Sequence, residues 1–314
     1  MKTLVIGAGG VGGCIGAALA EAGFDVTIAA RGEHGRIVRE HGLTIRTGTT
    51  ERRVRFTNVV AAADSLQQRF ELVLLAVKWP ELESACDALP NLIAVDGVVV
   101  PLLNGLSSED VVMTYVGAQR TVSGVAYMSA GLIEPGAIYV NGRPRVGLAP
   151  YRPGQDAEVA RIEALFTKAQ LPVQLSADYR AMLWQKMVWN APFNGICALS
   201  QRSAGACLEQ MEPLLRRAML EVLAVARAED VLLPDQLVDA LLEVTRSEYA
   251  LTEPSMLQDV RKGRPTEVDI LQGEVVRRAA RLGIDVPVLG TLATLVRGLT
   301  QAPSEDNRQL STAK

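Results

Sequence analysis

A run of small residues near the N-terminus has a spacing suited to binding phosphate groups. Residues 7–12 are Gly7-Ala8-Gly9-Gly10-Val11-Gly12, which matches the pattern GxGxxG. In such a loop the first glycine permits a tight turn, the second lets the backbone approach a pyrophosphate, and the third allows close packing of a helix on a strand. Glycine clusters also mark ordinary turns, so the flanking elements decide what the motif means.

The segments around this motif form a strand–helix–strand pattern. Thr3–Ile6 is a short apolar run, Cys14–Ala22 has helical apolar spacing, and Asp25–Ala30 is a second apolar run. A glycine motif between a strand and a helix places phosphate at the helix N-terminus, where backbone N–H groups and the helix dipole favour negative charge. The context therefore favours a dinucleotide site over a purely structural turn.

The end of the second strand indicates which dinucleotide binds. An NAD site usually has Asp or Glu there to bind the ribose 2′-hydroxyl, but this chain reads Ala29-Ala30-Arg31-Gly32. A guanidinium can bind the 2′-phosphate of NADP through two parallel hydrogen bonds. Arg31 therefore predicts NADPH. Two alternatives stay open: Arg31 as a solvent-exposed loop residue, and Glu33 as a ribose ligand.

A second group of polar residues lies in a predicted helix, Tyr179–Leu199. Lys186, Asn190 and Asn194 are spaced i, i+4, i+8 and so share one side of that helix, among apolar and aromatic neighbours. Asparagine is a poor helix former, so this stripe favours the wall of a polar pocket over an ordinary amphipathic face, which remains the alternative. Pro192 is expected to kink the helix or locally loosen its hydrogen bonding.

Two further segments have helix-start patterns. Ser255-Met256-Leu257-Gln258 resembles a capping box for a helix over Ser255–Lys262, and Thr266-Glu267-Val268-Asp269 resembles the start of a helix that runs to Leu282. Ser255 and Thr266 would then be simple caps, with acids favoured by the helix dipole. In the functional alternative, Ser255 helps to bind a carboxylate and Glu267 faces Lys186.

The wider pattern predicts an α/β protein with a Rossmann-type N-terminal domain and an all-helical C-terminal domain. Phe70–Val77 and Val98–Leu103 are nearly continuous apolar runs, typical of strands covered on both faces. Several short strands are expected from Thr121 to Leu148, as a meander completing the sheet, and helical patterns dominate after about Asp178. We predict a dinucleotide-binding domain at 1–176, a helical substrate domain at 177–301 and a polar tail at 302–314.

Composition excludes several other classes. The 314 residues are 48% hydrophobic and 21% charged with a net charge of −3, which argues against a nucleic-acid-binding protein. Four widely spaced cysteines and two histidines make a metal site improbable by spacing. No signal peptide or membrane-spanning run is recognisable. A cytoplasmic protein is expected, with no membrane or nucleic-acid partner, and a homodimer is left open.

At this point the chain resembles the ketopantoate reductase family over almost its whole length. The matching segments are GAGGVGG at 7–13, Arg31, AVK at 76–78, NG at 104–105, KMVWNAPFNGICAL at 186–199 and SMLQDVRKGRPTEVDILQG at 255–273. The last two segments are the specific ones, whereas the glycine motif is common among dehydrogenases.

The resemblance implies an active site in the cleft between a Rossmann and a helical domain, and NADPH-dependent reduction of the C2 carbonyl of ketopantoate in coenzyme A biosynthesis. By motif position, Lys186 would be the general acid, with Glu267 orienting it or the substrate. The other implied roles are the substrate hydroxyl for Asn190 and Asn194, the carboxylate for Ser255, and the nicotinamide side for Lys78 and Asn104, where Asn104 also serves the substrate.

Small departures from the family pattern leave the substrate open. Leu103 precedes Asn104, Gln272 stands where Asn is usual, and Trp79-Pro80 follows Lys78. A reductase acting on another 2-oxoacid is therefore an alternative. A non-catalytic NADPH-binding sensor is a third, although the intact Lys186–Asn190–Asn194–Glu267 set argues against it, since a sensor needs no proton donor.

Overall fold

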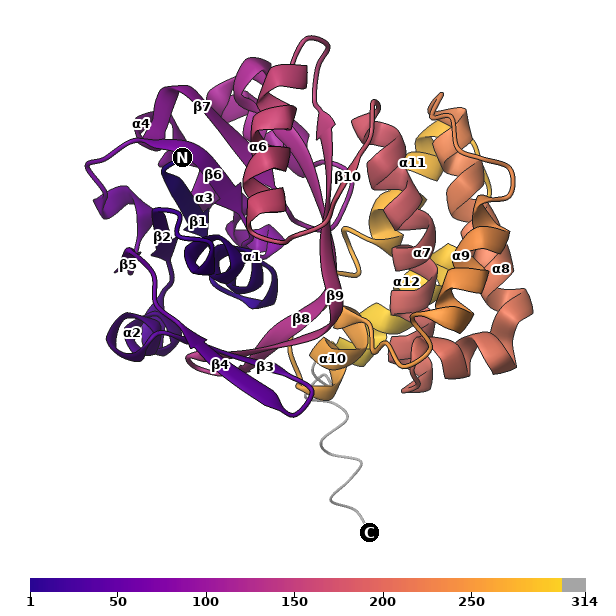
Figure 1. Ribbon diagram of the computed structural model, residues 1–314. Coiled ribbons are helices and arrows are strands. Elements are labelled where there is room, and N and C mark those ends of the chain that lie inside the picture. The colour runs from indigo at the N-terminus through magenta and orange to yellow at the C-terminus, as the bar shows by residue number, and fades with distance from the viewer. Residues whose placement is uncertain (301–314) are drawn as a thin grey trace, which may run out of the picture. The chain divides into compact units, whose positions relative to one another are not determined.

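The computed structural model describes residues 1–300, which divide into two compact units (Figure 1). Unit 1 comprises Met1–Trp184 and unit 2 begins at Gln185. The predicted domain boundary at 176 stays a prediction, and the predicted polar tail at 302–314 lies outside the described residues. The two units are described separately below.

Unit 1 contains a five-stranded parallel sheet with the order β5-β2-β1-β6-β7. Its strands are β1 (Thr3–Ile6), β2 (Val26–Ala29), β5 (Asn58–Val60), β6 (Phe70–Leu75) and β7 (Ile93–Pro101). Successive side chains point to opposite faces of a strand, so Val5, Leu72 and Leu74 join one buried cluster, while Leu4, Val73 and Leu75 join the other. The Rossmann-type sheet covered on both faces is thus confirmed.

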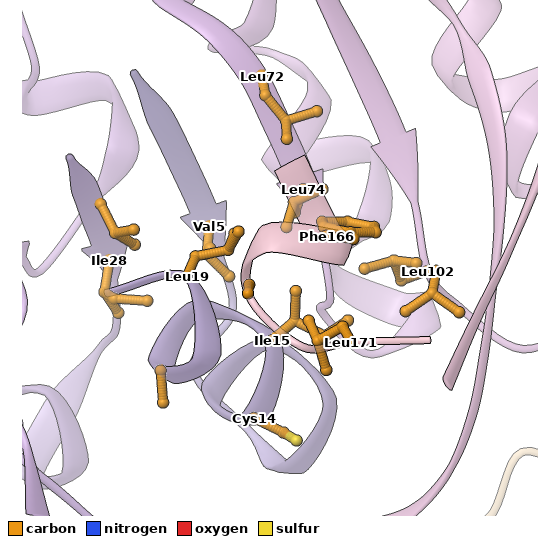
Figure 2. Packing of buried hydrophobic residues seen from close by; sticks show 14 of the residues in the cluster. Val5, Cys14, Ile15, Leu19, Ile28, Leu72, Leu74, Leu102, Phe166 and Leu171 are labelled. Carbon is orange, nitrogen blue, oxygen red and sulfur yellow. The ribbon is translucent and has the colours of Figure 1, made fainter. Parts of the chain in front are cut away.

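Helices cover both faces of this sheet. On one face lie α1 (Gly10–Glu21) and α6 (Asp156–Lys168), and Figure 2 shows Ile15, Leu19 and Phe166 gathered on Val5 and Leu74. On the other face lie the helices α3 (Leu82–Cys86), α4 (Leu89–Leu92) and α5 (Ser108–Val116). The helix α2 (Gly32–His41) follows β2, and Val38 from it joins the first cluster.

The segment after Thr121 differs from the prediction of short strands completing this sheet. It forms one long antiparallel hairpin, β8 (Val122–Glu134) and β9 (Ala137–Pro150), which belongs to a second sheet with β3 (Leu43–Thr47), β4 (Thr50–Val54) and β10 (Val173–Leu175). The turn at Pro135-Gly136 uses a positive φ of +82° at the glycine. Other glycines in this segment serve close packing, since a Cβ on Gly147 would lie 2.8 Å from the sulfur of Met182.

Helix α1 lies between the two sheets, and its glycines face both. Added Cβ atoms on Gly12 and Gly16 would contact Val5 of the first sheet, whereas those on Gly10 and Gly13 would meet Ala130 and Ile138 of the second. Helix α1 therefore contains many glycines because both sheets approach it too closely for a larger side chain at these positions.

Unit 2 is helical throughout its described part, which runs from Gln185 to residue 300. Its helices are the greater part of α7 (Tyr179–Ser200), α8 (Ala204–Ala228), α9 (Leu237–Ser247), α10 (Ser255–Arg261), α11 (Gln272–Leu282) and α12 (Pro287–Thr300). Helix α7 continues past Pro192, and among the described residues of this unit a non-helical backbone conformation within a helix is found in α8, at Met211. Among residues 1–300, no helix is both long and apolar enough to cross a membrane.

The helix predicted to begin at Thr266 is wrong in its first turn. Residues 268–271 form a turn in which the N–H groups of Ile270 and Leu271 donate to the carbonyl of Glu267, and α11 begins only at Gln272. The acid expected to support the helix start, Asp269, instead pairs with Arg297 of α12 at 2.7 Å.

Candidate functional site

Each glycine of the motif has a distinct geometric reason in the loop at residues 7–12, called the glycine loop below. Gly7 has a φ of +100°, a conformation that L side chains rarely adopt. A Cβ on Gly12 would lie 2.0 Å from the carbonyl oxygen of Gly7, so only glycine allows α1 to start this close to β1. A Cβ on Gly9 would meet no atom within 4 Å, which leaves its backbone open to a ligand.

The loop fits a pyrophosphate. Helix α1 begins at Gly10 directly behind the open backbone of Gly9, and its first turn contains no acidic residue. The first N–H groups of a helix have no partner within the helix, so they can donate to an anion. Gly10 has a separate reason to be glycine, because a Cβ there would lie 2.3 Å from the backbone carbonyl carbon of Ala130 in β8.

Three predicted cofactor residues follow strands β2, β6 and β7 of the parallel sheet, of which β2 and β6 flank β1. Ile6 pairs in register with Ala29 on one side and Leu75 on the other, and Leu75 pairs with Pro101. The strands therefore end at one level, and Arg31, Lys78 and Asn104 come two or three residues beyond it. This edge is where the strand order reverses, the place at which open α/β sheets bind their ligands.

The segment after β2 contains both residues that the sequence offered as ligands for the ribose side of the cofactor, Arg31 and Glu33. Arg31 is the N-cap residue of α2, its side chain is 64% exposed, and its guanidinium lies 3.5 Å from Glu81. Glu33, the alternative ribose ligand, accepts hydrogen bonds from Arg36 at 2.7 and 3.0 Å. Its hydrogen bonds with Arg36 lower the pKa of the Glu33 carboxyl. The acid near the ribose position is thus already paired with a cation.

In unit 2, the stripe of Lys186, Asn190 and Asn194 lies on α7 and is called the polar stripe below. Asn190 is 8% exposed and Asn194 3% exposed, while Lys186 is half-buried. An ordinary amphipathic face would expose such residues. The amphipathic alternative is therefore wrong for the two asparagines. The neighbouring Trp189 stacks on Phe193 and donates a hydrogen bond to Thr245 of α9, which anchors the other side of the helix.

Asn194 links α7 to the start of α10. Its amide oxygen accepts hydrogen bonds from the hydroxyl of Ser255 at 3.3 Å and from the backbone N–H of Met256 at 3.0 Å. Its amide nitrogen donates to the carbonyl of Asn190 at 3.0 Å. Asn194 therefore caps α10 from a different helix, and the two predicted substrate residues Asn194 and Ser255 are in contact.

This geometry corrects the predicted capping box. Ser255 is the first residue of α10, Pro254 is its N-cap, and Gln258 donates to the carbonyl of Glu253. The box failed because proline at the cap has no side-chain acceptor, so the orphan N–H of Met256 is satisfied by Asn194 instead. Ser255 is exposed, which keeps its hydroxyl accessible to a ligand.

Gln272 was identified from the sequence only as a departure from the family pattern. It is fully buried, and its amide nitrogen donates to the carbonyl of Ala191 at 2.7 Å, so it supports α7 one position away from Asn190. Glu267 lies half-buried in the turn before α11. Thr266 does not cap a helix, since its buried hydroxyl has no hydrogen-bond partner.

Unit 1 alone defines a class, that of proteins with a dinucleotide-binding Rossmann domain, and the comparisons extend this to the whole chain. The model of ketopantoate reductase PanE/ApbA matches residues 3–153, and that of its C-terminal domain matches residues 178–300. A 2-dehydropantoate 2-reductase from Halobacterium salinarum is 34% identical over 95% of this chain and 98% of its own. The chain therefore belongs to the ketopantoate reductase family, a family of dinucleotide-dependent oxidoreductases.

Solved structures agree with this assignment. A PanE/ApbA family ketopantoate reductase from Ralstonia eutropha is 31% identical with a TM-score of 0.85, covering 98% of this chain and 100% of that chain. A D-mandelate dehydrogenase with NADH and anilino(oxo)acetate is 25% identical with a TM-score of 0.89, covering 96% and 98% of the two chains.

Proposed function

We propose that this protein reduces 2-dehydropantoate to pantoate with NADPH, a step in the biosynthesis of pantothenate and coenzyme A. The observation that carries the substrate assignment is the similarity to a 2-dehydropantoate 2-reductase along nearly the whole chain. The buried amides of Asn190 and Asn194 support it, because they provide polar groups suited to a substrate that bears a hydroxyl in addition to its carboxylate.

The residues of the polar stripe would carry the chemistry. Reduced nicotinamide, when bound, supplies hydride to the carbonyl carbon. The negative charge that develops on oxygen then needs a proton donor, and we assign this role to Lys186. Glu267 would orient Lys186 or the substrate, Ser255 would bind the carboxylate, and Lys78 and Asn104 would line the nicotinamide side.

The preference for NADPH is supported by the end of β2. There Arg31 presents an exposed guanidinium, while the acidic alternative Glu33 is bonded to Arg36. The 2′-phosphate carries negative charge that a guanidinium binds through charge-assisted hydrogen bonds. NADH presents only a neutral hydroxyl at this position.

A second candidate function is the reduction of a different 2-oxoacid. The D-mandelate dehydrogenase structure, solved with NADH, is as similar in fold as the ketopantoate reductases. Its name indicates a 2-hydroxy acid with an aromatic substituent. Such an activity would use the same proton donor but a less polar substrate pocket.

A panel of 2-oxoacids with each cofactor tests these candidates. Oxidation of NADPH and NADH is followed by absorbance with ketopantoate, 2-oxoisovalerate and phenylglyoxylate. Ketopantoate should exceed 2-oxoisovalerate in kcat/KM by about tenfold to a hundredfold, because the missing hydroxyl leaves buried polar groups unpaired, at a cost of about 1–3 kcal/mol.

Other outcomes identify other functions. Equal kcat/KM for ketopantoate and 2-oxoisovalerate contradicts the ketopantoate assignment, and a preference for phenylglyoxylate supports the second candidate. Dinucleotide binding without turnover of any 2-oxoacid would indicate the sensor alternative.

A further inference from the structure

One histidine connects the glycine loop to the second sheet of unit 1. His34 lies half-buried in the first turn of α2, three residues after Arg31. Its Nδ1 accepts a hydrogen bond from the backbone N–H of Gly136 at 2.9 Å, and its Nε2 lies 2.9 Å from the carbonyl oxygen of Ala8. A backbone N–H can only donate, so Nδ1 is unprotonated and Nε2 carries the hydrogen that is donated to Ala8.

The bond to Ala8 has a consequence for the next residue. The carbonyl of Ala8 and the N–H of Gly9 belong to one planar trans peptide and point in opposite directions. When His34 holds the carbonyl, the N–H of Gly9 is directed away from the histidine. Gly9 is the loop residue whose added Cβ would meet no atom within 4 Å, so this peptide borders open space.

The other end of the connection is firmly supported. Gly136 forms the turn between β8 and β9, and its carbonyl accepts a hydrogen bond from Thr44 of β3 at 2.9 Å. A Cβ on Gly136 would lie 2.2 Å from a methyl group of Ile37, so the turn also packs directly on α2. A second contact between the same regions is the close packing of Gly10 on Ala130 of β8.

We propose that neutral His34 is a positioning residue for the dinucleotide: it braces the Ala8–Gly9 peptide against the β8–β9 turn, so that the N–H of Gly9 is presented to the pyrophosphate. This inference rests on the proposed dinucleotide-dependent function. Because NADPH and NADH share the pyrophosphate, His34 should affect both cofactors equally, which distinguishes its role from that of Arg31.

Protonation of His34 would break this arrangement. A hydrogen added at Nδ1 removes the acceptor for the N–H of Gly136. Burial lowers the pKa of His34, an effect that the hydrogen bond to Ala8 partly opposes, so the neutral form persists below the ordinary value of about 6.5. Charged groups on the contacting elements are paired among themselves, as Glu33–Arg36 and Arg31–Glu81 around α2 and Glu134–Arg46 beside the turn.

Two substitutions separate the two hydrogen bonds. His34→Asn keeps an acceptor near the position of Nδ1 but is too short to reach Ala8. His34→Gln places an amide N–H near the position of Nε2 and gives up the acceptor for Gly136. Dissociation constants for NADPH and NADH are measured by fluorescence between about pH 5 and 8, the range of histidine titration, with kcat for the 2-oxoacid that the panel selects.

The expected result is a rise of about threefold to tenfold in both dissociation constants for His34→Asn at neutral pH, the effect of one lost hydrogen bond. His34→Gln keeps the bond to Ala8 but lacks the acceptor for Gly136 at every pH, so it should show a smaller rise at neutral pH. It should also lack the further loss of affinity that wild type shows once the pH falls well below the ordinary histidine pKa of about 6.5. The kcat should change little in either variant. His41→Ala is the control, because His41 is the chain's other histidine and is exposed.

The contrary outcomes are distinct. Wild-type affinity for both dinucleotides in His34→Asn overturns the proposal, as does a lower melting temperature with unchanged affinity, which would assign His34 to fold support alone. A loss confined to NADPH would also overturn it, by placing the effect at the 2′-phosphate. A wild-type protein that binds neither dinucleotide would instead contradict the proposed function itself.

Discussion

In the glycine loop of unit 1, backbone atoms make the contacts that define the geometry, whereas in the polar stripe of unit 2 side chains make them. Gly12 is fixed by the carbonyl of Gly7, and Gly10 by the backbone of Ala130. Asn194, in contrast, uses its amide to hold Ser255 and Met256 on another helix. Both regions are expected to bind polar groups of small molecules. The geometry of the glycine loop depends on the absence of side chains, whereas that of the polar stripe depends on buried side chains.

This difference decides how each region responds to substitution. Substitutions other than proline keep the backbone N–H groups, so the glycine loop is altered by adding side-chain atoms or by removing the contacts that support it. The polar stripe is altered by removing a functional group, and each removal can leave a buried partner unsatisfied at a cost of about 1–3 kcal/mol. Substitutions in the stripe should therefore affect catalysis most, and those around the loop should affect cofactor affinity.

The largest effect is expected at Lys186. Lys186→Ala removes the proposed proton donor and should lower kcat by about a hundredfold or more, with NADPH affinity nearly unchanged, because a positioned general acid contributes about that much. Lys168→Ala is the matched control, since Lys168 is exposed in the last turn of α6. If kcat for Lys186→Ala stays within a few-fold of wild type, the polar stripe has a structural role only. The proposed catalytic function of unit 2 is then wrong.

A smaller and more selective effect is expected at Arg31. Arg31→Ala should weaken NADPH by about one to two decades and leave NADH almost unchanged, because only NADPH offers a phosphate for charge-assisted hydrogen bonds. Arg31→Lys should be intermediate, since it keeps the charge and loses the planar fork. KM values for both cofactors decide this. Equal losses of affinity for the two cofactors would show that Arg31 stabilises the loop and does not bind the 2′-phosphate.

The parts of the fold that depend on local sequence could be predicted. Strand β1 was expected at its observed bounds, and β6 and α1 only with shifted ends, because apolar runs and glycine placement are local signals. The second sheet could not be predicted in this way. The glycines of β8 and β9 suggest turns, but Gly131 and Gly147 are required by Tyr139 and Met182, which are contacts made only in the folded chain.

The same reasoning applies to the candidate site. The glycine loop and Arg31 follow from a motif and its position after a strand. Asn194 as a cap for α10, Gln272 as a support for α7, and His34 as a link to the β8–β9 turn all depend on partners far along the chain. A histidine at the start of a helix carries no signal of such a partner, so these roles could be found only from the structure.

Adding one methyl group in the glycine loop is expected to affect cofactor binding no more than Arg31→Ala does, and it tests the backbone side of the comparison most directly. Gly9 has an extended conformation, with φ −68° and ψ −163°, that alanine adopts readily, and its Cβ would point into open space. Gly9→Ala should therefore keep the melting temperature and weaken the binding of both dinucleotides by about tenfold, roughly the loss of one charge-assisted hydrogen bond.

Gly12→Ala is the matched contrast. Its Cβ would lie 2.0 Å from the carbonyl of Gly7, so it should lower the stability of unit 1 by about 3 kcal/mol or more. Thermal unfolding together with cofactor titration separates the two. Unchanged affinity in a folded Gly9→Ala protein would mean that the pyrophosphate does not approach the backbone here, whereas a destabilised Gly9→Ala protein would mean that Gly9, like Gly12, serves the fold.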